Sequence, residues 1–71
     1  MRTLKQYTLE VIWPGRTDIN QIFATSMDWS QSGMYMFYKS DLDGKNSKMI
    51  ACYPIINTVI REIAEVKEET N

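Results

Sequence analysis

The feature that most constrains this chain is a strand-forming segment that has no polar face. Residues 34–38 are five consecutive large apolar or aromatic residues, too few for a helix and rich in strand formers. In a strand, Met34, Met36 and Tyr38 would point to one side, and Tyr35 and Phe37 to the other. A sheet in a chain of 71 residues can bury one face by itself. The second face must therefore be covered by closure into a barrel, by the C-terminal segment or by another subunit.

Other segments have the alternation of half-buried strands. In residues 6–13, one face would carry Tyr7, Leu9, Val11 and Trp13. Pro14-Gly15 then predicts a turn. Residues 19–28 alternate more weakly and predict a second strand, with a short helix from Asp18 as the alternative.

Three further segments complete the predicted meander. Residues 26–33 are mostly short polar residues ending in glycine, which predicts a loop or wide connection around Trp29. Residues 40–47 contain Asp43-Gly44, a pair typical of hairpin turns. Residues 48–53 would be the returning strand, closed by Pro54.

The C-terminal segment, residues 55–71, supports two interpretations. Its apolar residues recur at steps of three and four, and helix formers such as Lys67 and Glu68 follow. Local periodicity therefore favours an amphipathic helix. Several of its apolar residues are β-branched, however, and a sheet of four short strands would gain from a fifth.

The side chains needed for common catalytic and metal sites are missing. The sequence contains no histidine, so the usual general base and imidazole ligand are absent. Its one cysteine, Cys52, can form no internal disulfide, and its apolar strand predicts an inert core thiol. Asp41-x-Asp43-Gly44 lacks the glutamate of a calcium loop, because Ile50 stands at that position. We expect no enzyme activity, no cofactor and no metal.

Charge and hydropathy restrict the partners. Eight basic residues balance nine acidic ones without a strongly cationic segment, which makes nucleic acid an unlikely partner. No apolar run approaches the ~20 residues that span a bilayer, so no membrane partner is expected. A lone thiol and an N-terminus without an apolar leader predict a cytoplasmic location.

The order of features resembles that of small proteins encoded by bacteriophages. The resemblance is carried by Ala24-Thr25-Ser26, then residues 33–38, a polar turn, Ile50-Ala51-Cys52-Tyr53-Pro54 and an isoleucine-rich end. It implies a β-rich fold with a terminal strand, which we adopt for residues 58–66, and an accessory role that inhibits or sequesters a host factor in the host cytoplasm.

Together these observations predict one β-rich domain over residues 1–71, a small antiparallel sheet or barrel of four to five strands. The alternative is an α+β fold with a C-terminal amphipathic helix over the sheet. We expect a non-enzymatic binding protein that acts as a homo-oligomer on a host protein or small ligand. The alternatives are a nucleic-acid-binding module and a structural or assembly protein.

Five residues are candidates for the binding site: Trp29, Asp28, Tyr35, Phe37 and Tyr53. Trp29 stands out because exposing an indole in so polar a stretch is costly. Two interpretations remain open for it. Trp29 either folds back as a lid on the sheet edge or anchors a partner, as tryptophans at binding hot spots do.

Overall fold

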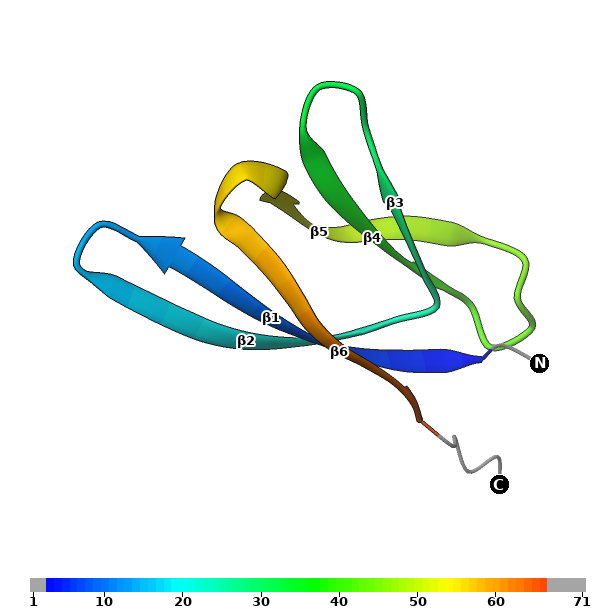
Figure 1. Cartoon of the computed structure of the whole chain (residues 1–71). Coiled ribbons are helices and arrows are strands. Elements are labelled where there is room, and N and C mark those ends of the chain that lie inside the picture. The colour runs from blue at the N-terminus through cyan, green and yellow to red at the C-terminus, as the bar shows by residue number, and fades with distance from the viewer. Residues whose placement is uncertain (1–2, 67–71) are drawn as a thin grey trace.

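The computed structural model describes residues 3–66, which form six strands, one short 3₁₀ turn and no α-helix (Figure 1). The elements are β1 (Leu4–Trp13), β2 (Arg16–Ala24), β3 (Ser26–Trp29), β4 (Met34–Ser40), β5 (Ser47–Pro54), η1 (Ile55–Asn57) and β6 (Thr58–Val66). The prediction of a small, mostly β fold is confirmed. No helix in this part of the chain is long and apolar enough to cross a membrane.

The strands divide between two antiparallel sheets, where the sequence suggested one sheet or barrel. Sheet A has the order β2-β1-β6 and sheet B the order β3-β4-β5. The division occurs at Thr25, the single residue between β2 and β3. Its backbone N–H and its hydroxyl both donate to the carbonyl of Tyr38, at 2.8 and 3.1 Å. Thr25 thus connects β2, which pairs with β1 in sheet A, to β3, which pairs with β4 in sheet B.

The core lies where the inner faces of the two sheets meet. Sheet A contributes Tyr7, Leu9, Ile22 and Ala24, and sheet B contributes Phe37, which is fully buried. The rings of Tyr7 and Phe37 pack edge to face with centroids 5.1 Å apart. The predicted inward face of β1 is confirmed at Tyr7, Leu9 and Val11, which are buried.

Trp13 leaves this core although its place in the alternation is inward. It is 43% exposed, because the β1–β2 hairpin projects away from sheet B (Figure 1). Pro14 and Gly15 form the predicted turn, with Gly15 at a φ of 84°.

The loop predicted for residues 26–33 is wrong over its first half. Ser26–Trp29 is strand β3, because its backbone finds a ladder partner in β4 that local composition does not reveal. The turn is confined to residues 30–33. There the Gly33 N–H donates to the Ser30 carbonyl at 3.0 Å, and Gly33 adopts a φ of 91°.

The strand favoured for residues 58–66 is confirmed as β6, which pairs antiparallel with β1. The competing helix would have left one edge of β1 without a ladder partner. Lys67 and Glu68, two of the residues that favoured helix, lie outside the described residues.

Candidate binding site

Three aromatic residues form one cross-strand row on the inner face of sheet B. Trp29 on β3 lies opposite Tyr35 on β4, and Tyr35 lies opposite Tyr53 on β5. Directly opposed residues in antiparallel strands share a face, so these three side chains project from the same face of sheet B. We call Trp29, Tyr35 and Tyr53 the aromatic row. The structure thus joins three of the five predicted site residues.

Trp29 stands at the open end of this row. Trp29 is 64% exposed, so most of the residue is accessible to a partner. The turn that follows it is held by hydrogen bonds: Ser30 N–H to the Met34 carbonyl at 2.9 Å, and Ser30 Oγ to Ser32 Oγ at 2.7 Å. The backbone that presents the indole is therefore preorganised.

Phe37 is fully buried next to the aromatic row and does not contact solvent. It lies in the next cross-strand row, opposite Met27 and Ala51, on the same face. Its ring packs edge to face against Tyr53, with centroids 6.2 Å apart. Tyr35 and Tyr53 are themselves partly buried against this core. Phe37, named as a candidate binding residue, is placed by the structure in the core.

Asp28 lies on the opposite, outer face of sheet B, opposed to Met36, which is in turn opposed to Cys52. Its Oδ1 accepts the N–H of Trp29 at 2.8 Å, so it positions the backbone of the aromatic row. The core location predicted for Cys52 is wrong, because Cys52 is exposed on this outer face. β5 is apolar on both faces, and the core covers the face that carries Ala51 and Tyr53, not the face that carries Cys52.

The outer face of sheet B is apolar as well. Met34, Met36 and Tyr38 project from β4, and Tyr38 Oη donates to the Met36 sulfur at 3.5 Å. A bulge at Ile50 moves Met49 opposite Tyr38, on this same face. Sheet B therefore has the two apolar faces that the sequence indicated.

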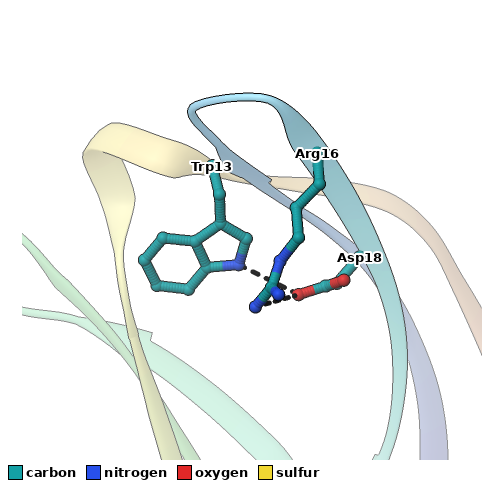
Figure 2. A network of polar contacts seen from close by, with 3 residues as sticks. All are labelled: Trp13, Arg16 and Asp18. Carbon is teal, nitrogen blue, oxygen red and sulfur yellow. Dashed lines mark hydrogen bonds and ion pairs between the residues drawn. The ribbon is translucent and has the colours of Figure 1, made fainter.

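A polar cluster at the tip of the β1–β2 hairpin was not predicted. Trp13 Nε1 donates to Asp18 Oδ2 at 3.0 Å, and Arg16 Nη2 approaches the same oxygen at 3.5 Å (Figure 2). The spacing Trp13-x-x-Arg16 across a two-residue turn could have indicated it, because Trp13 and Arg16 are ladder partners. The cluster joins the two strands of the projecting hairpin through side chains on one face.

Two buried polar atoms next to η1 have no hydrogen-bond partner among the described residues, Asn57 Oδ1 and Thr58 Oγ1. Thr58 is only 4% exposed and lies opposite Val11. Its unpaired hydroxyl is a local weakness in the packing of sheet A, because burying a polar group without a partner costs free energy.

No three His, Cys, Asp or Glu residues within residues 3–66 are grouped so that they could hold a metal ion. Two lysines lie on the same face of sheet B as the aromatic row. They are Lys39 and Lys48, which are ladder partners near the end of the sheet away from Trp29.

No protein-family model, curated protein or solved structure matches the chain.

Proposed function

We propose that this chain is a non-enzymatic binding protein that holds its partner against the aromatic row and acts as a homo-oligomer. The observation that carries the proposal is the alignment of Trp29, Tyr35 and Tyr53 across three strands. Tryptophan and tyrosine supply large contact areas with few rotatable bonds, and they are enriched at binding hot spots.

The chemistry of the row favours a partner with an apolar or aromatic group and hydrogen-bonding groups beside it. The exposed indole offers an apolar surface, and the two tyrosines add hydroxyl groups that donate and accept hydrogen bonds. A side chain of a host protein and a small aromatic ligand both have this character. The resemblance to phage-encoded proteins supports an inhibitory or sequestering role.

Native mass spectrometry of the purified protein tests the proposal, because it reports the subunit number and any retained molecule together. We expect an oligomer that carries a bound molecule or protein, and we expect Trp29→Ala to lose it while melting like the parent. Loss of an anchor at a hot spot typically costs roughly 2 kcal/mol or more, about thirtyfold in affinity.

Trp13→Phe is the matched control, because it alters the other tryptophan of the chain, on sheet A. It should retain the bound molecule. A Trp29→Ala variant that keeps the molecule, or one that loses most of its thermal stability, would contradict the proposal. The second result would restore the interpretation of Trp29 as a lid.

Single-stranded nucleic acid is the second candidate partner, and one observation favours it. Lys39 lies on the same strand face as Tyr35 and Phe37, with Lys48 opposite it. Aromatic rings on a sheet flanked by cations suit bases and phosphates. Retention of a single-stranded oligonucleotide that weakens steeply with salt, and with Lys39→Gln, would favour this candidate over the first.

A further inference from the structure

The free edge of β6 offers the most specific interaction surface of the molecule. β6 ends sheet A, and no strand within residues 3–66 lies along its other side. β6 pairs with β1 on one side, so the backbone N–H and C=O groups that point to its other side are unpaired among the described residues. We propose that this edge pairs antiparallel with the same edge of a second copy, with Arg61 opposite the partner's Glu62.

The register of β6 against β1 sorts its side chains between the two faces of sheet A. The inner face carries Thr58, Ile60, Ile63 and Glu65, which oppose Val11, Leu9, Tyr7 and Lys5. The outer face carries Val59, Glu62 and Ala64, which oppose Glu10, Thr8 and Gln6. Arg61 is the extra residue at a bulge, and its guanidinium bonds to Glu10, which places it on the outer face.

Opposed residues of an antiparallel pair must share a face, and this condition selects one register. With Arg61 opposite the partner's Glu62, Ile60 meets the partner's Ile63 on the inner face. Val59 then meets the partner's Ala64 on the outer face. A register shifted by one residue would set Ile60 opposite the partner's Glu62, or Arg61 opposite the partner's Ile63. Each of these pairs would join an inner-face residue to an outer-face residue. The bulge at Arg61 is what makes the matching register self-complementary.

The same register also matches charge and apolar surface. Two-fold symmetry gives two Arg61–Glu62 ion pairs and two Ile60–Ile63 contacts. Ile63 is 52% exposed although it is on the inner face, because it lies at the uncovered edge of sheet A. The partner's Ile60 would cover it. The Arg61 side chain is 58% exposed, so its guanidinium can keep Glu10 and add the partner's Glu62.

This inference rests on the homo-oligomer of the proposed function and names the surface that forms it. The aromatic row lies on sheet B, whereas β6 belongs to sheet A. The two proposals can therefore fail separately: Trp29→Ala should leave the dimer intact, and a disrupted β6 edge should leave the aromatic row in place.

Sedimentation over a range of concentrations tests the pairing with two matched charge reversals on β6. The wild-type chain should dimerise. Glu62→Lys sets a lysine beside the partner's Arg61 twice, so we expect its dissociation constant to rise at least tenfold, by the rough size of cross-strand charge effects. Lys5→Glu with Glu65→Lys makes the same charge reversal opposite the partner's Thr58 and keeps opposite charges at the Lys5–Glu65 ladder pair within the chain, so it should stay within about twofold of the parent.

A compensating variant separates loss of pairing from loss of folding. Adding Arg61→Glu and Glu10→Lys to Glu62→Lys reverses the ion pairs between copies and keeps a partner for residue 61 within the chain, so dimerisation should return. In a Cys52→Ser background, Val59→Cys with Ala64→Cys should give a disulfide-linked dimer on oxidation, because the two positions oppose each other. Val59→Cys alone should not, because the two copies of residue 59 lie too far apart.

Three results would overturn the proposal. The first is a wild-type chain that stays monomeric at every concentration. The second is a dimer that the Lys5→Glu, Glu65→Lys variant weakens as much as Glu62→Lys does. The third is a dimer whose dissociation constant Glu62→Lys leaves unchanged. That result would indicate that the dimer forms through another surface, such as the apolar outer face of sheet B.

Discussion

Sheet A and sheet B share one core, but they differ in the face that they turn away from it. The outer face of sheet A mixes polar groups, such as Gln6, Thr8 and the Glu10–Arg61 ion pair, with the exposed apolar side chains of Ile19 and Phe23. The outer face of sheet B carries Met34, Met36 and Cys52. The outer face of sheet A is thus mixed, whereas β4, the central strand of sheet B, is apolar on both faces over residues 34–38. Charged groups therefore divide the apolar surface outside sheet A, and sheet B has apolar surface in excess of what the core needs.

The largest expected effect on the free energy of unfolding comes from removing the Phe37 ring, which is the side chain that sheet B buries in the shared core. Phe37→Ala should lower the free energy of unfolding by about 3–5 kcal/mol, because Phe37 is fully buried between Tyr7 and Tyr53. Chemical denaturation measures the change. The chain's other phenylalanine, Phe23, is 44% exposed, and Phe23→Ala should cost about 1 kcal/mol or less. Equal losses in the two variants would show that the sheets do not share this core.

A smaller effect of opposite sign is expected in sheet A. Thr58→Val should raise the free energy of unfolding by about 1 kcal/mol, because it removes a buried hydroxyl that has no partner. Thermal denaturation gives the comparison. Thr8→Val, a change of the same chemistry on the partly exposed face of β1, is the control and should be close to neutral. A less stable Thr58→Val variant would show that the hydroxyl is hydrogen-bonded in solution.

The two faces of sheet B can be compared through neighbouring residues of β5. Cys52→Ser should change the free energy of unfolding by no more than about 0.5 kcal/mol, because Cys52 is exposed. Ala51→Ser should cost more, because Ala51 packs against the core. Denaturant titrations of both variants provide the test, and a larger loss at residue 52 would place the core on the other face of sheet B.

The smallest effect is confined to alkaline solution. Burial raises the pKa of the Tyr7 phenol above its usual value. The unfolded chain therefore loses this proton first, so the contribution of Tyr7 to stability is complete below about pH 10 and declines above it. Tyr7→Phe should flatten the alkaline decline of the melting temperature. An unchanged alkaline profile in Tyr7→Phe would assign that decline to other groups.

The candidate site was partly predictable. Trp29 is predictable as a binding residue because exposing an indole in so polar a stretch is costly. Tyr35 and Tyr53 are predictable because strands that are apolar on both faces hold more aromatic surface than a small core can bury. Their alignment into one row depends on ladder register, which pairs residues up to 18 positions apart in the chain. The same register moved Asp28 to the other face and Phe37 into the core. The Trp13–Asp18 contact was missed because it depends on the hairpin bringing the two residues together.

Features that depend on neighbouring residues could be predicted from the sequence. The alternation in β1 has one apolar face, so its inward side followed directly from the pattern. The turns at Gly15 and Gly44 followed from the ability of glycine to adopt the positive φ found there, 84° and 81°.

Where the local pattern fits more than one structure, contacts between distant residues select one of them. Residues 34–38 are apolar on both faces, so only packing against Tyr7 selected the face of Phe37 as the inner one. Residues 58–66 fit a helix or a strand, and the open edge of β1 selected the strand. The bulge at Arg61, between β1 and β6, and the division of the sheets at Thr25, whose N–H bonds to the Tyr38 carbonyl, likewise depend on pairing with segments elsewhere in the chain. Local pattern cannot resolve these choices, because their energies depend on contacts between residues far apart in the chain.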